Sequence, residues 1–274
     1  MTGLARFARN RLAVAGAALL GCLLLLVALS PVLYPGDPFR LAGPALQPPG
    51  RAFLLGTDTL GRDVAAGIAH GARTSLLVGV CATLGAIVFG VVVGGLAGFY
   101  RGATETALMR LTEFFQTIPS FVLAILIVAI LSPSVSTEII AIAAVSWPGV
   151  ARLVRGEFVA LGAREFVLAC AGLGASDARI IFRHLLPNCM SAIIPVGSLL
   201  IGSSILLEAG LAFLGLGDPN VMSWGLIISA GRAVLRSAWW ICTFPGIAIL
   251  LTVLAINLAG DGLNEALNPR LRER

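Results

Sequence analysis

The side chains that could catalyse a reaction or bind a metal are few in this sequence and lie far apart. Histidine occurs only twice, at His70 and His184, and neither has a neighbour at the spacing of a metal-binding pair. The five cysteines form no C-x-x-C pair and lie mostly in apolar runs, where a free cysteine packs as a small hydrophobic residue. The odd count also argues against a disulfide framework. We therefore expect no metal site.

The basic residues exclude two further kinds of chemistry. All 19 are arginine, and the chain contains no lysine. A P-loop needs a lysine whose ammonium group reaches the β- and γ-phosphates, and Schiff-base catalysis needs a lysine amine. We therefore predict that the chain is not an enzyme, has no catalytic residues and holds no cofactor. If ATP drives the protein, another chain must bind the nucleotide and its Mg²⁺.

Two polar residues in the apolar runs are candidates for a pathway or a gate. Glu208 lies within a long apolar run, and a carboxylate at the centre of a membrane helix costs about 2.5–3.5 kcal/mol on insertion scales. We expect it to face the interior of a helix bundle, either as part of a pathway or gate or as the acceptor of a structural hydrogen bond. Asn257, with Asp261 nearby, lies close to the inner end of the last apolar run, where it could mark a gate or cap a helix.

A third polar region is predicted to form two short helices joined by a glycine. The residues from Ala163 to Leu173 favour a helix, and Gly174 stands where a glycine would end it. Ser176 is placed to cap a second helix with Asp177 in its first turn. That helix carries Arg179, Arg183 and His184 and is expected to stop at Leu186-Pro187. The pair either lies on the membrane surface or docks a cytosolic partner.

The elements that carry these residues are expected to be membrane helices. The chain is 58% hydrophobic, only 12% charged and has a mean hydropathy of +0.95, which excludes an ordinary soluble domain. A spanning helix needs about 20 apolar residues, and six candidates occur. They run from Leu12 to Leu33, Ser75 to Tyr100, Ala107 to Leu131 with a kink at Pro119, Glu138 to Val154 with a break near Trp147-Pro148, Met190 to Leu216 and Ile241 to Leu258.

The arginines set the orientation, because basic loops stay on the cytoplasmic side. With the N-terminus inside, thirteen of the 19 arginines are cytoplasmic, so we predict that both termini and the segment 163–188 lie inside. The fold class is all-α. The chain divides into a first helix with its outer loop (1–74), a five-helix core (75–266) and a cytoplasmic tail (267–274).

The cytoplasmic segment resembles the EAA loop of ABC importer permeases. That pattern is Glu-Ala-Ala, three residues, Gly, nine residues, Ile, any residue, Leu-Pro. The chain keeps the spacing but has Leu168, Cys170 and His184 in place of Glu, Ala and Ile. The resemblance assigns ATPase coupling to this loop. The residues carried over or placed on its two helices are Ala169, Gly174, Ser176, Asp177, Arg179, Arg183, His184, Leu186 and Pro187.

Further motifs resemble the C-type subunit of the dipeptide, oligopeptide and nickel permeases. They are Leu55-Gly56-Thr57-Asp58, Leu60-Gly61-Arg62-Asp63, residues 71–76, residues 183–188, Phe213-Leu214-Gly215-Leu216-Gly217, Ser223-Trp224-Gly225, Asn257-Leu258 and residues 260–263. In the outer loop, Asp58, Arg62 and Asp63 are expected to cap and pair within the chain, or else to contact a binding protein.

The resemblance implies a multi-pass protein of the bacterial inner membrane. It would share a solute pathway with a homologous B-type permease, bind two cytosolic ATPases and receive peptides, a nickel complex or glutathione from an extracytoplasmic binding protein. Lipid is the other expected partner, and nucleic acid is not expected. The alternative is an ion-coupled secondary transporter, which would show inverted repeats. An intramembrane enzyme would need clustered polar residues at membrane depth. The sequence does not distinguish the possible solutes.

Overall fold

The computed structural model describes residues 7, 8 and 10–267, and within them the chain is all-helical, as predicted, with no strand. Five helical segments are long and apolar enough to cross a membrane, and a bent pair of helices brings the number to as many as six. The long helices are α2 (Arg11–Leu33), α3 (Val64–Tyr100), α6 (Val135–Gly162), α9 (Leu186–Phe213) and α11 (Trp240–Leu267). The predicted tail lies outside the described residues, apart from Leu267.

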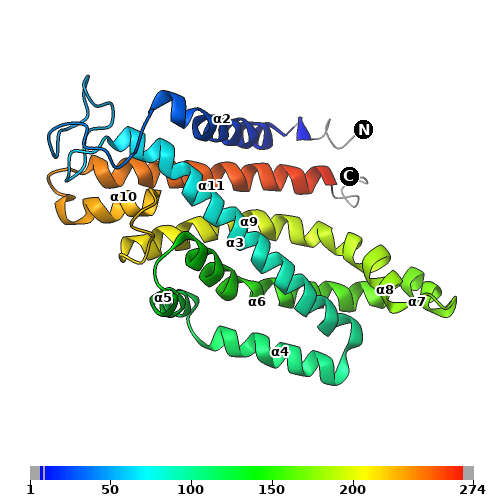
Figure 1. Cartoon of the computed structure of the whole chain (residues 1–274). Coiled ribbons are helices and arrows are strands. Elements are labelled where there is room, and N and C mark those ends of the chain that lie inside the picture. The colour runs from blue at the N-terminus through cyan, green and yellow to red at the C-terminus, as the bar shows by residue number, and fades with distance from the viewer. Residues whose placement is uncertain (1–6, 9, 268–274) are drawn as a thin grey trace.

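The predicted third span is two helices rather than one kinked helix. α4 (Gly102–Thr117) and α5 (Ser120–Leu131) meet at an angle of 85°. Ile118 has an extended backbone (φ −89°, ψ 129°), because a residue before proline is disfavoured in the helical region. In Figure 1, α4 runs along the bundle and α5 is seen nearly end-on.

The break predicted near Trp147-Pro148 is wrong, because α6 continues through both residues. Proline removes a backbone donor and normally bends a helix, but here both residues are buried and Trp147 packs against α3. A Cβ built on Gly90 of α3 would lie 2.9 Å from the Trp147 carbonyl oxygen, so the two backbones are in close contact. Packing against a neighbouring helix therefore keeps the proline-containing turn helical.

The predicted stop at Leu186-Pro187 is also wrong. α8 (Asp177–Ile180) runs through a single π-helical turn, η1 (Ile181–Leu185), directly into α9, so one helical segment extends from Asp177 to Phe213. Pro187 lies in the first turn of α9, directly after the π turn, so its missing N–H interrupts the ladder of helical hydrogen bonds without ending the segment. The fifth span thus begins well before the predicted Met190.

The second span also begins earlier than predicted, at Val64 rather than Ser75. The carboxylate of Asp63 caps α3 by accepting the backbone N–H of Ala65 at 2.9 Å. The proposed boundary between residues 74 and 75 consequently falls inside a helix. The part of α3 before Ser75 lies beside α10 (Trp224–Gly231), which is followed by the 3₁₀ turn η2 (Arg232–Val234).

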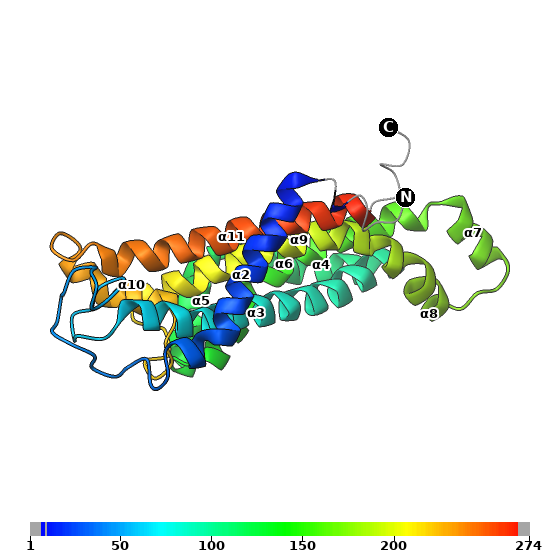
Figure 2. The same ribbon diagram turned by 90° about the horizontal axis from the view of Figure 1, so that it is seen from above.

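The helices form an elongated bundle with different structures at its two ends. α2 packs beside α11 on one side, and α4 and α5 lie on the opposite side (Figure 1). α7 (Glu165–Gly172) and α8 project beyond the bundle at one end, whereas the loop 34–63 and α10 lie at the other (Figure 2). The predicted coupling loop and the predicted outer loop therefore occupy opposite ends of the bundle.

Candidate functional site

The projecting segment 163–188 has the helix–glycine–helix structure that the sequence predicts. α7 ends with Leu173, whose N–H donates to the Ala169 carbonyl at 3.0 Å, and Gly174 follows with φ +80°. Ser176 occupies the N-cap position of α8, with Asp177 in the first turn, but its side chain makes no capping hydrogen bond. The positive φ at Gly174 favours glycine and turns the chain from α7 into α8.

One face of this segment is fixed to the bundle and the other is exposed. Val167, Ile180 and Leu185 are buried in the same cluster as Phe158 and Leu161 at the end of α6. Three other large apolar side chains of the segment are mostly exposed. They are Leu168 (59% exposed), Leu173 (89%) and Phe182 (69%). Exposed apolar side chains grouped in this way are typical of a protein or membrane contact.

The basic and polar residues of the segment lie around these apolar side chains. Arg179 and Arg183 are exposed, and so are Ala169, Gly174, Ser176, Asp177 and Pro187, while His184 and Leu186 are half-buried. Most of the predicted residues are thus exposed on the projecting segment. Leu168, Leu173 and Phe182 were not among the predicted site residues, although their place in a polar, arginine-rich loop was visible in the sequence.

Two departures from the EAA pattern contact each other. The Cys170 Sγ atom of α7 lies 3.7 Å from the Nε2 atom of His184, and the ring of Phe166 lies 6.4 Å from the His184 ring. The pattern has Ala and Ile at the two substituted positions. The thiol and the imidazole therefore hold α7 against the π turn where the pattern has two apolar side chains.

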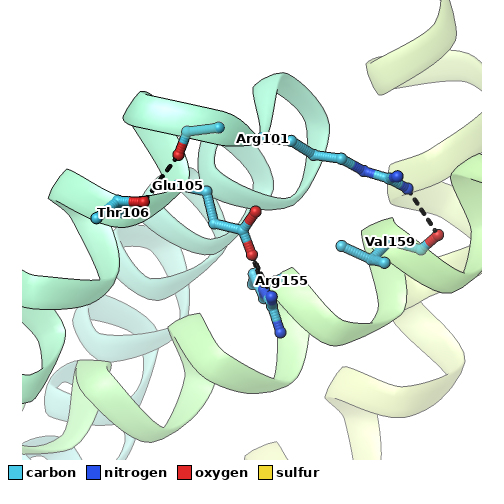
Figure 3. Close-up of polar contacts among 6 residues, drawn as sticks. Arg101, Glu105, Thr106, Arg155 and Val159 are labelled. Carbon is cyan, nitrogen blue, oxygen red and sulfur yellow. Dashed lines mark hydrogen bonds and ion pairs between the residues drawn. The ribbon is translucent and has the colours of Figure 1, made fainter.

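A second polar site lies between α4 and α6 near the same end of the bundle. A cavity of about 510 Å³ is lined by Glu105, Thr106, Met109, Arg110, Glu113, Arg152 and Arg155. Figure 3 shows Arg155 of α6 paired with Glu105 of α4, and Arg101 donating to the Val159 carbonyl at 3.3 Å. The Arg155 Nε atom lies 2.7 Å from the Glu105 Oε1 atom, and Nη2 contacts the same oxygen.

Sequence reasoning did not identify this ion pair, because its members are 50 positions apart. We expect a double-mutant cycle with Glu105→Gln and Arg155→Met to give a coupling free energy of about 1 kcal/mol, since the pair is only partly exposed. Thermal unfolding of the purified protein in detergent measures it. The exposed Arg110–Glu113 pair is the control and should give about 0.3 kcal/mol. Equal coupling in the two cycles would contradict a bridging role for Arg155.

Glu208 lies inside the bundle, as expected. Its side chain is 1% exposed, and its Oε2 atom accepts the hydroxyl of Ser75 at 3.0 Å. The other oxygen has no hydrogen-bond partner among the described residues. Glu208 thus makes the structural hydrogen bond that was one of the two expectations for it. Asn257 lies in α11 with its side-chain oxygen also buried and without a partner in the described part of the chain.

A second buried carboxylate, Glu138, was used only to mark the start of a span. It lies in the first turn of α6, is 2% exposed and has one oxygen without a partner among residues 7, 8 and 10–267. A Cβ built on Gly217 would lie 3.5 Å from that oxygen. The only sign of this buried group in the sequence was a carboxylate at the edge of an apolar run. That position alone does not show whether a side chain is buried or exposed.

The outer loop motif folds back on the chain. The Asp58 Oδ1 atom accepts the backbone N–H groups of Leu60 and Arg62, and the Thr57 hydroxyl donates to the Pro44 carbonyl. The guanidinium of Arg62 stacks 4.9 Å from the centre of the Phe39 ring. Gly56 and Gly61 have φ +80° and +83°. Together with the capping by Asp63, these contacts match the expectation of internal capping, although the partner of Arg62 is an aromatic ring.

The two histidines have different surroundings. The Nε2 atom of His70 lies 2.9 Å from the Tyr34 carbonyl oxygen, near the outer loop, while His184 lies in the projecting segment. In the described part of the chain, no group of three or more His, Cys, Asp or Glu side chains could hold a metal ion. Burial and the Asp63 carboxylate raise the pKa of the Tyr34 phenol.

Comparison with known proteins identifies the family. Residues 86–273 match the family described as binding-protein-dependent transport system inner membrane component, and residues 3–49 match the N-terminal membrane domain of oligopeptide transport permease C. The chain is 40% identical to the di/tripeptide transport system permease protein DppC of Pseudomonas aeruginosa, covering 97% of this chain and 90% of the relative.

Other relatives and a solved structure agree with this assignment. The dipeptide transport system permease protein DppC of Bacillus subtilis is 39% identical (97% of this chain, 84% of the relative). The glutathione transport system permease protein GsiD of Pectobacterium atrosepticum is 40% identical (82% and 75%). The inward-facing methionine ABC transporter MetNI has a similar fold, with a TM-score of 0.63 at 17% identity (74% and 96%). The chain therefore belongs to the binding-protein-dependent transport system inner membrane component family, and it is a multi-pass inner-membrane permease of the ABC transporter class.

Proposed function

We propose that the chain is the C-type permease subunit of an ATP-driven importer for peptides or a related small solute. It would form the pathway together with a homologous B-type permease, and an extracytoplasmic binding protein would deliver the solute. Two cytosolic ATPases would supply the energy, because the chain has no lysine and therefore no P-loop of its own. Relatives named for dipeptides, di/tripeptides and glutathione support this solute class.

The projecting segment 163–188 is the observation that carries this proposal. Its apolar and basic face stands clear of the bundle at the end opposite the outer loop, as an ATPase docking surface requires. With this end in the cytoplasm, most of the arginines lie inside, in accordance with the positive-inside rule. The ATPases would bind one state of the permease more tightly than the other. Their movement on this surface would therefore shift the permease between the two states.

The functional roles of the membrane polar groups are part of the proposal. The cavity between α4 and α6 opens near the end that carries the coupling segment, so its charged lining would face solute leaving the pathway. Asn257 would contribute to the inner end of the pathway from α11. Glu208 would act away from the solute, because its carboxylate is enclosed by the chain's own helices.

Reconstituted uptake tests the proposed function. The chain, its B-type partner and the two ATPases are placed in liposomes, and uptake of a labelled dipeptide is measured with the binding protein outside. We expect uptake that requires internal ATP and is blocked by vanadate. Liposomes that lack the ATPases are the control and should not accumulate the peptide. Uptake driven by an ion gradient without ATPases would instead identify a secondary transporter.

A further inference from the structure

Three of the sequence motifs that have no role in the proposal above meet at the outer end of the bundle. Residues 71–76 lie in α3. Residues 213–217 start at the last residue of α9, and Ser223-Trp224-Gly225 lie at the start of α10. Residues 214–223, here named the outer hairpin, connect the last two. The meeting point lies at the end of the molecule opposite the coupling segment (Figure 1).

A chain of two hydrogen bonds joins the three helices. The backbone N–H of Trp224 donates to the Ser75 Oγ atom at 3.3 Å, and the Ser75 hydroxyl donates to the Glu208 Oε2 atom at 3.0 Å. Ser75, Trp224 and Glu208 are all at most 1% exposed. Ser223 also caps α10, because its hydroxyl accepts the N–H of Leu226 at 3.2 Å. Ser75 of α3 therefore joins the first turn of α10 to Glu208 of α9 by hydrogen bonds.

Close packing prevents the outer hairpin from sliding along α9. A Cβ built on Gly225 would lie 2.7 Å from the Cα atom of Ala209, and one built on Gly217 would lie 2.8 Å from the Cβ atom of Ala212. Real Cβ atoms do not approach this closely, so both glycines are in backbone contact with the last turns of α9. When α9 moves, both ends of the hairpin must move with it.

The helix that carries Glu208 reaches the coupling segment without a break. The helical segment from Asp177 to Phe213 contains 37 residues, which corresponds to about 55 Å at 1.5 Å per residue. Its first residues belong to the exposed surface that bears Arg179 and Phe182. A continuous helical segment of this kind can transmit a displacement between two sites when both bias its position.

From this geometry we infer that Glu208, acting through Ser75, is a positioning residue that couples the outer hairpin to the ATPase-facing end of the same helix. The inference rests on the proposed function. The carboxylate touches no solute in this role. It holds the start of α10 in register with α9, so that binding-protein docking outside and ATPase movement inside are linked.

The stimulation of ATPase activity by the binding protein measures this link. In the reconstituted complex, Ser75→Ala removes both hydrogen bonds of the chain without adding bulk. We expect it to lower the stimulated rate by about tenfold, within the usual range of coupling between sites, while the basal ATPase rate and the yield of assembled complex stay the same. Glu208→Gln should retain stimulation, because the amide oxygen still accepts the Ser75 hydroxyl, whereas Glu208→Ala should lose it.

Ser203→Ala is the matched control, since within the described residues this exposed hydroxyl of α9 bonds only to the Leu199 carbonyl of its own helix. It should leave stimulation unchanged. Normal stimulation in Ser75→Ala would overturn the inference. A proportional loss of the basal and stimulated rates would also overturn it, because it would indicate that Ser75 has only a folding role. A wild-type complex whose ATPase does not respond to any binding protein would instead refute the proposed function on which the inference rests.

Discussion

Gly94→Ala is expected to prevent the chain from accumulating in its folded form. A Cβ built on Gly94 would lie 2.2 Å from the carbonyl oxygen of Ala151, a backbone atom of α6 that cannot rotate away. Either α3 or α6 must shift, and these two helices share the most extensive contact in the bundle. Overpacking a core typically costs about 1–3 kcal/mol, and a clash with backbone lies at the upper end of that range. Yield and thermal unfolding temperature in detergent measure the effect.

Gly156→Ala provides the matched control for this prediction. Gly156 lies on the same helix as Ala151, but a Cβ built on it meets no atom within 4 Å. Alanine is also the better helix former, so this change should leave the unfolding temperature unchanged or raise it slightly. If the two variants are equally stable, the close approach of α3 and α6 is not needed for the fold.

The apolar runs located the membrane helices but not their full lengths. Hydropathy identifies only the apolar part of a helix, and both α3 and the segment beginning at Asp177 start before the apolar runs that the sequence showed. Their true starts depend on the Asp63 cap and on the π turn. Neither leaves an apolar signal. A sequence read by hydropathy alone therefore divides each of these helices at the membrane surface.

The two prolines at Pro119 and Pro148 show why local sequence is insufficient. Each lies within an apolar run, yet one separates two helices by 85° and the other lies inside a continuous helix. The difference comes from the neighbours. Pro148 is buried in the bundle beside Trp147, which packs against α3, whereas Pro119 lies at the exposed turn between α4 and α5. Such tertiary contacts are not encoded within a few residues of the proline.

The candidate site was predictable from the sequence where it depends on residues that are adjacent in the chain. Gly174, Ser176 and Asp177 take the predicted positions in the projecting segment, because a glycine turn and a helix cap are encoded by adjacent residues. The Glu105–Arg155 pair and the contact between Ser75 and Glu208 join residues far apart in the chain, and one sequence gives no sign of such pairs. The sequence therefore does not show which partner a single charged residue has, and the fold does.

Leu173→Asp is expected to weaken binding of the ATPase subunits without changing the stability of the permease. Leu173 is 89% exposed at the tip of the projecting segment, so the folded chain loses almost no packing when the side chain is replaced. Burying a leucine in an interface contributes about 1.5–3 kcal/mol, and a buried aspartate would also need a partner. The affinity should therefore fall by about tenfold to a hundredfold, measured as binding of the purified ATPases to the permease in nanodiscs.

Leu54→Asp is the control for this last prediction, because Leu54 is likewise exposed (74%) but lies in the loop at the opposite end of the bundle. ATPase affinity should be unchanged in this variant, and both variants should unfold at the wild-type temperature. Dipeptide uptake should fall with ATPase binding in Leu173→Asp, since the energy reaches the pathway only through this surface. An Leu173→Asp permease that binds the ATPases at full affinity would place the docking surface elsewhere and would remove the observation on which the proposed coupling role depends.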